Sequence, residues 1–257
     1  MAETGLHYRL KPEDEFTHDP GDAKNYNESM YFNAFDHAKR FGGWFRLGNR
    51  PNENYAEMSV CLYLPDGRVA FMFQRPSISH NDAMDAGGMR IDVVEPFKTL
   101  RLTYEGEALI LSDPLQMATP KEAFKSNPRK PCKVDLTYTG ESPMYGGEMV
   151  KADGSPIEID PEKSFAKAHY EQHCSVKGTI TVDGETLDPW SGVAKLLLVP
   201  MLILVEGHTH DYRRIQLRQL RVDAPPVIVG RVLFALAPQD DLWPDAHDVV
   251  RPAHIFA

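Results

Sequence analysis

Three Asp-Gly pairs constrain the fold of this chain more than any other feature of its sequence. Each lies between segments in which apolar and polar residues alternate: Asp66-Gly67, Asp153-Gly154 and Asp183-Gly184. A two-residue hairpin loop needs a positive φ at its centre, and Asp followed by Gly adopts that backbone at low steric cost. The sequence therefore predicts a chain built mainly from antiparallel β-sheet.

The segments beside the first pair show the alternation most clearly. Apolar side chains recur at every second position from Met58 to Leu64 and again from Val69 to Phe73. This period places one face of a strand against a core and leaves the other face partly polar. The same period fits residues 100–104, 109–111, 134–138 and 176–182. Strands spaced this regularly predict a sandwich or a barrel.

Composition and charge exclude several classes of partner. The chain has 257 residues, of which 42% are hydrophobic and 25% are charged, as in ordinary globular proteins. Its net charge is −9 and its basic residues form no stripe, so we expect no nucleic-acid partner and no anionic membrane surface. The longest apolar run, residues 196–205, is too short to cross a bilayer, so membrane insertion is not expected.

The N-terminal segment and the cysteines bear on the cellular compartment. Residues 1–16 contain four acidic side chains and no apolar segment, so we predict no secretory signal and a cytoplasmic location. Three cysteines, Cys61, Cys132 and Cys174, cannot all pair and show no Cys-x-x-Cys spacing. They predict neither a disulfide framework nor a zinc site.

Motifs for metals and cofactors are absent or incomplete. His208-Thr209-His210-Asp211 is the segment most similar to a metal-ligand cluster, but no third ligand follows at a recognisable spacing. No Gly-x-Gly-x-x-Gly, Walker or Gly-x-Ser-x-Gly pattern occurs. We therefore expect no metal, no cofactor and no chemistry of the serine-hydrolase type.

The chain divides by composition into two expected β domains. Residues 1–139 form the first, which begins with an extended, polar and aromatic lead-in. Residues 113–131 contain four prolines around a short helical stretch, Lys121 to Lys125, and are expected to be a connector within it. The Gly- and Pro-rich residues 140–160 form the expected boundary, and residues 161–257 form the second domain.

Two groups of segments resemble a known family. The segment Gly43-Trp44-Phe45-Arg46-Leu47-Gly48-Asn49-Arg50-Pro51-Asn52, followed by Leu64-Pro65-Asp66-Gly67, resembles the lipocalin-like family related to the carotenoid 1,2-hydratases (hydroxyneurosporene synthases) and the AttH proteins. Later, Tyr170-Glu171-Gln172, Gly178-Thr179-Ile180 and Val182-Asp183-Gly184 resemble the opening of that family's second domain. The resemblance implies an all-β fold of two consecutive lipocalin-like (calycin) antiparallel β-barrels or half-barrels. Because residues 196–257 are atypical, we expect the second to be incomplete.

The same resemblance implies a class of function. Members of that family include enzymes that hydrate isolated alkenes and enzymes that direct pericyclic cyclisations. It therefore implies hydration, isomerisation or cyclisation of an apolar terpenoid, steroid or polyketide-like molecule by a cofactor-independent lyase or isomerase. The alternative is a non-catalytic carrier of such a molecule. An ionisable side chain inside the ligand site favours the enzyme, whereas a wholly apolar lining favours the carrier.

Candidate proton-transfer groups occur where the second expected domain begins. Glu171 and His173 share one face of a strand, and a carboxyl beside an imidazole can deliver and remove a proton. Tyr170 would orient the substrate through its hydroxyl. A carboxyl desolvated in an apolar site retains its proton to higher pH, as protonation of an alkene requires. The structural alternative is that Glu171 binds a nearby arginine and His173 is an exposed strand residue.

Candidate ligand-binding residues are mainly aromatic. Trp44, Tyr55 and Trp190 suit the wall of a site for a flat or prenyl-like molecule. Arg46 and Arg75 flank this region and would orient a carboxylate or hydroxyl of the ligand. The alternative places the aromatic residues in the core and the arginines on the surface. We expect Phe71 and Phe73, which lie nearby in the sequence, to belong to the core.

Composition changes abruptly at Lys195. All 13 lysines lie at or before this residue, and only Glu206 of the 17 glutamates lies beyond it. Asn and Ser are absent from residues 196–257. One hypothesis is a frameshifted or rearranged tail, which would leave an inactive product. The alternative is a genuine but divergent C-terminal segment.

Overall fold

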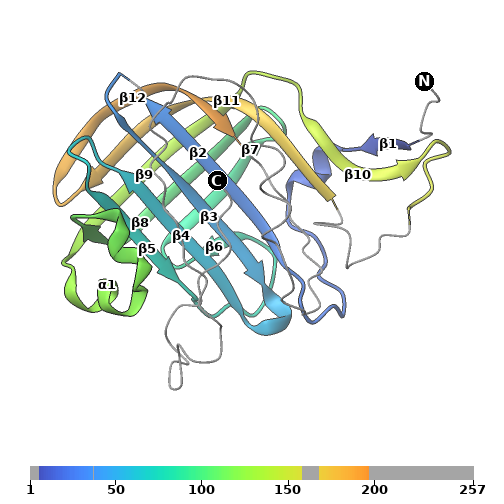
Figure 1. Ribbon diagram of the computed structural model, residues 1–257. Helices are drawn as coiled ribbons and strands as arrows, with labels where there is room; N and C mark the ends of the chain where they lie inside the picture. The colour runs from blue at the N-terminus through green and yellow to red at the C-terminus, as the bar shows by residue number, and fades with distance from the viewer. Residues whose placement is uncertain (1–5, 37, 158–167, 197–257) are drawn as a thin grey trace.

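The computed structural model describes residues 6–36, 38–157 and 168–196, and these form an all-β structure (Figure 1). Twelve strands of this part of the chain join in one sheet, and the paired strands within it are antiparallel, as the sequence predicted. The strands are β1 (Leu6–Arg9), β2 (Glu28–Asp36), β3 (Phe41–Arg50), β4 (Tyr55–Tyr63), β5 (Val69–Gln74), β6 (Met84–Ala86), β7 (Met89–Glu95), β8 (Thr99–Leu111), β9 (Arg129–Gly140), β10 (Tyr145–Lys151), β11 (Ala168–Val182) and β12 (Glu185–Leu196). Short helical elements connect them: η1 (Pro12–Glu15), η2 (Pro51–Glu53), η3 (Pro114–Ala118) and α1 (Pro120–Ser126).

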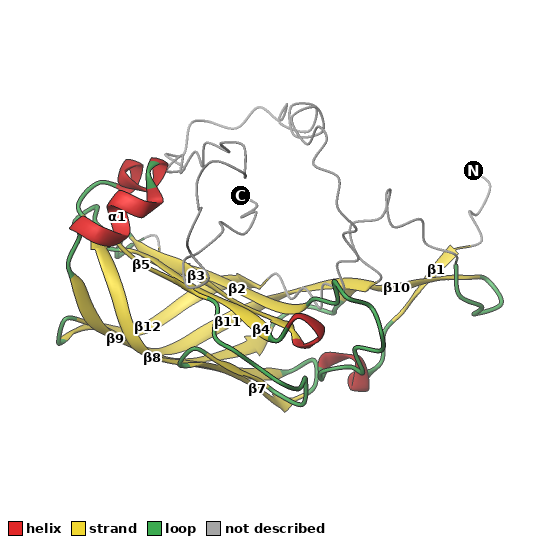
Figure 2. Cartoon of the chain, turned by 90° about the horizontal axis from the view of Figure 1, so that it is seen from below, coloured by secondary structure: helices red, strands yellow, loops and turns green. Residues whose placement is uncertain are grey.

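The sheet bends into two facing layers (Figure 2). Its strand order is β1-β10-β11-β9-β8-β5-β4-β3-β2, with β12 paired to the other side of β11. Strands β2 to β5 form one layer, and β8, β9, β11 and β12 form the other. β12 lies alongside β2, but no ladder joins these two strands within the described ranges. The sheet is therefore not closed, and the predicted all-β half-barrel architecture is confirmed.

The main core fills the space between the two layers. The largest fully buried side chains in it come from most strands of the sheet: Phe32, Phe45, Leu47, Met58, Leu62, Met72, Met89, Leu102, Tyr104, Tyr138 and Tyr170. Phe45 and Leu47 of β3 point inward, whereas Trp44 and Arg46 occupy the opposite face of the same strand. The period-two pattern of the sequence therefore assigns these side chains to the two faces correctly.

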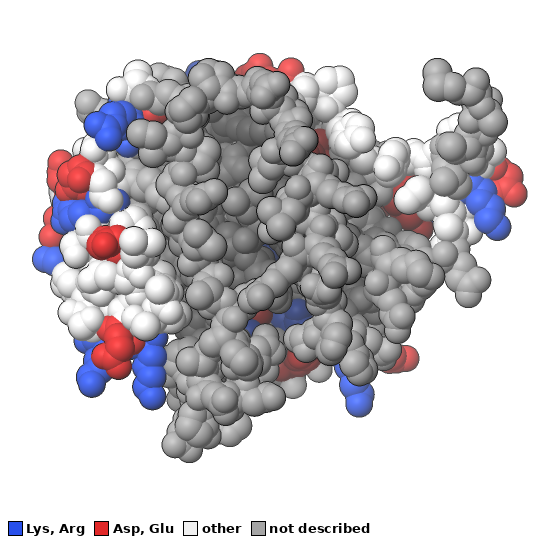
Figure 3. Space-filling model, viewed as in Figure 1, with Lys and Arg blue, Asp and Glu red and all other residues white. Residues whose placement is uncertain are grey.

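A smaller apolar cluster lies on the outer face of the β2–β5 layer. It consists of Trp44, Cys61, Val69, Phe71, Phe73, Leu109, Leu111, Met117 and Ala123. η3 and α1 contribute Met117 and Ala123, so the predicted connector helix packs against one end of this face. Phe71 and Phe73 are buried here, as expected for core residues. Around α1, acidic and basic side chains lie side by side on the visible surface (Figure 3).

The Asp-Gly pairs form turns of more than one type. Asp183 and Gly184 both have positive φ, 54° and 80°, and form the predicted two-residue turn between β11 and β12. At the β4–β5 hairpin only Gly67 has a positive φ, and the Leu64 N–H donates to the Arg68 carbonyl across three loop residues. Pro65 suits the first inner position of the type I turn in such a loop, so the two-residue expectation was wrong there. At the third pair, Gly154 has a φ of 79° and its N–H donates to the carbonyl of Lys151.

Strands from both sides of the expected domain boundary belong to the same sheet. β9 precedes residues 140–160 and β11 follows them, and the two pair from Cys174 opposite Gly140 to Val182 opposite Cys132. β10 lies within the expected boundary segment and pairs with both β1 and β11. Residues 158–167 and 197–257 of the second expected domain lie outside the described residues. The division into two domains therefore stays a prediction.

Gly178 is the glycine of the sheet that least tolerates a side chain. Its φ is 151°, and a Cβ there would lie 2.0 Å from the backbone oxygen of Asp135 on β9. We expect Gly178→Ala to lower the free energy of unfolding by about 3 kcal/mol, because it combines backbone strain with overpacking. Gly184→Ala is the matched control, because Gly184 also has a positive φ but no atom lies within 4 Å of its added Cβ. Equal losses in urea unfolding of the two variants would contradict this account.

Candidate functional site

The three predicted catalytic residues occupy opposite faces of β11. Tyr170 is fully buried in the main core. Glu171 is half-buried, with its Oε1 3.1 Å from Nε2 of His169, and His173 is exposed. Glu171 and His173 share a strand face, as predicted, but it is the face turned away from the core and from Tyr170. The arrangement separates the predicted carboxyl–imidazole pair from the predicted hydroxyl.

A buried carboxyl that the sequence analysis did not single out lies near Tyr170 instead. Glu15, at the end of η1, has an exposed fraction of 0%. Its Oε2 accepts a hydrogen bond from the backbone N–H of Phe97 at 2.5 Å. Its Oε1 has no hydrogen-bond partner in the described part of the chain, and the same holds for the buried hydroxyl of Tyr170. Two unsatisfied polar groups in an apolar core are unusual, so these residues are candidates for a functional role.

Burial sets the protonation of this group of residues. It raises the pKa of the Glu15 carboxyl, and the hydrogen bond from Phe97 only partly offsets this effect. Burial, followed by the charge of Glu15, raises the pKa of the Tyr170 hydroxyl. Burial and the same carboxyl raise the pKa of the Cys174 thiol to about 12. At neutral pH the hydroxyl and the thiol are therefore neutral, and Glu15 is the group that can exchange a proton.

The backbone of Phe97 fixes Glu15 against the end of the sheet. Phe97 lies in the turn between β7 and β8 with a φ of 63°. Glu15 accepts a hydrogen bond from its N–H, and Nε2 of Gln172 donates to its carbonyl at 2.9 Å. Gln172 lies between Tyr170 and Cys174 on the inner side of β11. The turn at Phe97 is therefore held by hydrogen bonds to two polar side chains, Glu15 and Gln172.

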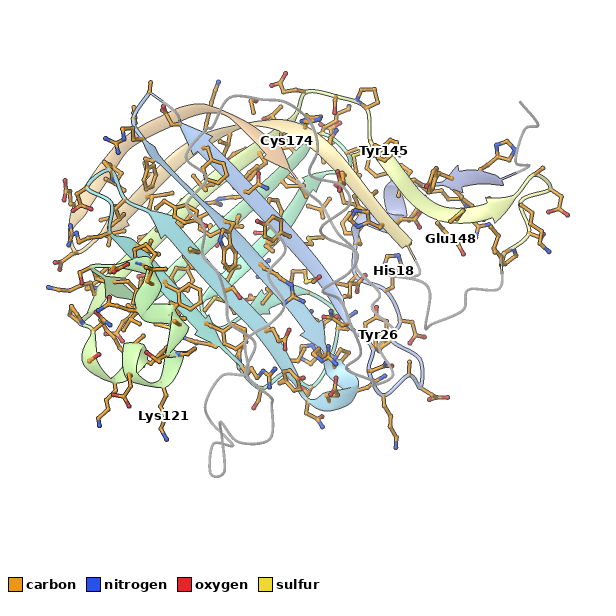
Figure 4. The ribbon with its side chains drawn as sticks, viewed as in Figure 1. His18, Tyr26, Lys121, Tyr145, Glu148 and Cys174 are labelled. Atoms are coloured by element: carbon orange, nitrogen blue, oxygen red, sulfur yellow. The ribbon has the colours of Figure 1, made fainter. Side chains whose placement is uncertain are left out.

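A second buried carboxylate nearby is fully engaged and differs in this respect from Glu15. Glu28 accepts hydrogen bonds from the Tyr26 hydroxyl at 3.0 Å, from Nδ2 of Asn81 at 2.7 Å and from the backbone N–H of His18 at 3.0 Å. His18 and Tyr26 lie at the end of the molecule opposite Lys121 of α1 (Figure 4). This network attaches the lead-in to β2, so we assign Glu28 a structural role.

Four of the five predicted ligand-binding residues, Trp44, Arg46, Tyr55 and Arg75, lie on the outer face of the β2–β5 layer. Arg46 and Arg75 both bind Glu57, at 3.1 Å and 2.9 Å. The guanidinium of Arg75 lies over the ring of Tyr55, 5.0 Å from its centroid. Trp44 precedes Arg46 by two residues on the same strand face. Trp190 belongs to β12, and its side chain lies outside the described part of the chain.

The outer-face group and the Glu15 group do not converge. The first lies on the outer side of the β2–β5 layer, and the second borders the core between the layers. Glu57, which joins the two arginines, was missed because a lone glutamate in a strand gives no sequence signal. Glu15 was missed because it follows Glu13 and Asp14 in an acidic run that is typical of a solvated segment.

A family model described as a domain of unknown function (DUF7064) matches residues 11–194. The chain belongs to this family. The DUF7064 region includes Glu15, Tyr170 and the outer-face group, and it ends one residue before Lys195, where the composition changes. It is compatible with the lipocalin-like resemblance. No curated protein and no solved structure matches the chain.

Metal ligands and membrane-spanning helices were both considered in the sequence, and the described residues provide neither. In the described ranges of this DUF7064 protein, no group of three or more His, Cys, Asp or Glu residues is placed to hold a metal ion. The cluster His208-Thr209-His210-Asp211 lies outside those ranges, as does the compositionally unusual segment 197–257. No helix among the residues described is both long enough and apolar enough to cross a membrane.

The buried carboxyl predicts a pH dependence of stability. Because the folded state raises the pKa of Glu15, it binds the proton more tightly than the unfolded state does. The contribution of Glu15 to the free energy of unfolding is fully present below about pH 4.5, its ordinary pKa. It is lost as the pH rises through the higher pKa of the folded state. Glu15→Gln should therefore gain stability relative to wild type as the pH increases from 5 to 9. Urea unfolding across this range measures the difference, and parallel profiles would contradict the prediction.

Proposed function

We propose that this protein binds an apolar terpenoid, steroid or polyketide-like molecule and transfers a proton to it from Glu15. The observation that carries the proposal is the fully buried Glu15 carboxyl, with one oxygen unpartnered in the described part of the chain, near the unpartnered hydroxyl of Tyr170. The reaction would be hydration, isomerisation or cyclisation by a cofactor-independent lyase or isomerase. The resemblance to the lipocalin-like family supports the same class of substrate.

The chemistry requires a neutral carboxylic acid next to an apolar substrate. The π electrons of an alkene take the Glu15 proton, which leaves a carbocation and a carboxylate. In hydration, water adds to the cation and returns a proton to the carboxylate; in isomerisation, a neighbouring C–H bond supplies that proton. Glu15 is regenerated in both cases. Tyr170 is placed to orient the reacting group through its hydroxyl.

A non-catalytic carrier would need a different lining of the ligand site. A carrier needs only an apolar lining, whereas an unpaired carboxyl buried in that lining reduces stability. Glu15, Tyr170 and Cys174 together place one acid, one hydroxyl and one thiol at the inner face of the half-barrel. These groups favour the enzyme over the carrier. We expect the enzyme to act in the cytoplasm.

Deuterium incorporation tests the proposal directly. The full chain is incubated in D2O with a panel of terpenoid alkenes, unsaturated steroids and linear polyketides, and the products are analysed by mass spectrometry. Hydration places deuterium at one carbon and adds D2O to the other, whereas isomerisation or proton-initiated cyclisation introduces deuterium at carbon without adding water. Thermal unfolding with the same panel reports binding separately. Ligands that raise the melting temperature without any deuterium incorporation would support the carrier instead.

A further inference from the structure

The two groups assigned to the reaction are closed off from solvent. Glu15 and Tyr170 both have an exposed fraction of 0%. Tyr170 belongs to β11, whose ladders with β9 and β10 fix it in the sheet, whereas Glu15 comes from η1 in the lead-in. A ligand can therefore reach these groups only if an element that covers them moves.

Residues 11–25, which we call the strap, are attached less firmly than the strands beside them. The strap begins after β1 and ends before β2, and no ladder of the described sheet includes it. Among its residues only Glu15 is buried, and its one large apolar side chain, Phe16, is 48% exposed. Segments with few buried apolar contacts open at a lower free energy than core strands. The strap is therefore expected to open while the sheet stays folded.

Side-chain hydrogen bonds hold the strap in place. Nδ2 of Asn81 donates to the carbonyl of His18 at 2.8 Å, and Glu28 accepts a hydrogen bond from the N–H of His18 at 3.0 Å (Figure 4). Nδ2 of Asn52 donates to two further strap carbonyls, at 3.0 Å and 2.8 Å. A single hydrogen bond of this kind changes an equilibrium by about fivefold, so a few of them can break together without unfolding the sheet.

The buried carboxyl favours opening. In the closed strap one oxygen of Glu15 accepts a hydrogen bond from the N–H of Phe97, and the other has no partner among the residues described. Burying a carboxyl in this way costs free energy, which is recovered when the group returns to water. This cost lowers the free energy that is needed to open the strap.

We propose that the strap opens as a unit, admits the apolar ligand to the inner face of β11 and, on closing, brings Glu15 to the bound molecule. This inference rests on the proposed function, because it takes Glu15 as the acid and the inner face as the ligand site. Asn81 and Asn52 hold the closed form. The acid is therefore delivered by a moving segment and not by the sheet itself.

Two buried thiols at opposite ends of one strand pair report on the opening. Cys174 pairs with Gly140 at one end of β9, and Cys132 pairs with Val182 at the other. They are 1% and 2% exposed, and burial raises the pKa of each thiol to about 12, so neither reacts in the closed form. The charge of Glu15 contributes to the raised pKa of Cys174, which places this thiol near the strap. Opening should therefore expose Cys174 and leave Cys132 buried.

Alkylation of the full chain at pH 8 tests the strap. Iodoacetamide and N-(1-pyrenyl)maleimide are compared, and mass spectrometry of the peptides gives the reaction rate at each cysteine. The pyrenyl reagent is flat, apolar and similar in size to a steroid, so its reaction shows that a molecule of the proposed kind enters. In wild type we expect Cys174 to react about tenfold faster than Cys132 with both reagents.

Two variants and a matched control locate the opening. Asn81→Ala and Asn52→Ala each remove donors to strap carbonyls and should speed the reaction of Cys174 about fivefold without changing that of Cys132. Asn52 is exposed, so its variant should fold even if Asn81→Ala does not. Asn127→Ala is the control, because it removes a similar hydrogen bond to a carbonyl of α1 and should alter neither rate.

The other outcomes overturn the proposal. Equal rates for Cys174 and Cys132 in wild type, or equal acceleration of both thiols in the variants, would show that labelling requires global unfolding. Reaction of Cys174 with iodoacetamide alone would show that the opening is too small for the ligand, and unchanged rates in both variants would show that the strap is not the segment that opens. Alkylation needs no substrate, so selective labelling of Cys174 without any deuterium incorporation would separate failure of the proposed proton transfer from failure of this inference.

Discussion

Replacing Glu15 with glutamine is expected to slow proton transfer to the substrate by about 10²- to 10⁴-fold. Glutamine keeps the size of the side chain and has no acidic proton to deliver. Its amide oxygen can still accept the hydrogen bond from the N–H of Phe97, so the turn between β7 and β8 should be retained. Binding of the apolar molecule should change little. The measurement is the rate of deuterium incorporation at saturating ligand, together with the ligand-induced rise in melting temperature.

Glu13→Gln is the matched control for this prediction. Glu13 belongs to the same short element, η1, but is exposed. Its replacement makes the same change of side chain on the same element and should leave the rate unaltered. If Glu15→Gln retains the wild-type rate, Glu15 is not the acid. If instead the half-exposed Glu171 proves essential, the sequence-based assignment on β11 would be restored.

Much of the fold can be predicted from local patterns in the sequence, whereas Glu15 becomes a candidate acid only through a contact that is distant in the sequence. Alternation along residues 58–64 and 69–73 and the turn at Asp183-Gly184 are local, so they predict β4, β5 and the β11–β12 hairpin. The burial of Glu15 depends on Phe97, which lies 82 residues away. No local pattern distinguishes Glu15 from Glu13.

The candidate site on β11 shows where alternation reaches its limit. The two-residue period of a strand predicts that Glu171 and His173 share a face, and they do. It does not state which face meets the core, because this depends on the register with β9 and β10. That register turns Tyr170 inward and Glu171 and His173 outward. The same limit applies to Arg46 and Arg75, which were identified although their common partner, Glu57, was not.

Glu57→Gln is expected to lower the free energy of unfolding by about 3 kcal/mol. Burial by itself would raise the pKa of Glu57, but Arg46, Arg75 and Arg50 together hold it below its ordinary value. The carboxylate is therefore ionised at neutral pH, and its removal leaves Arg46 as a buried cation without its counter-ion. The expected loss lies at the lower end of the range for buried pairs because Arg75 can still reach solvent.

An exposed pair in the same sheet provides the comparison. Asp135 binds Arg101 at 2.8 Å, but the two side chains are 42% and 50% exposed. Asp135→Asn should therefore cost less than about 1 kcal/mol, even though the contact is as short as those of Glu57. Urea unfolding of both variants at pH 7 measures the difference. Equal losses would show that Glu57 is no more critical than a surface carboxylate. A larger loss for Glu57→Gln would show that one buried charge holds Arg46 and Arg75 in place on the outer face.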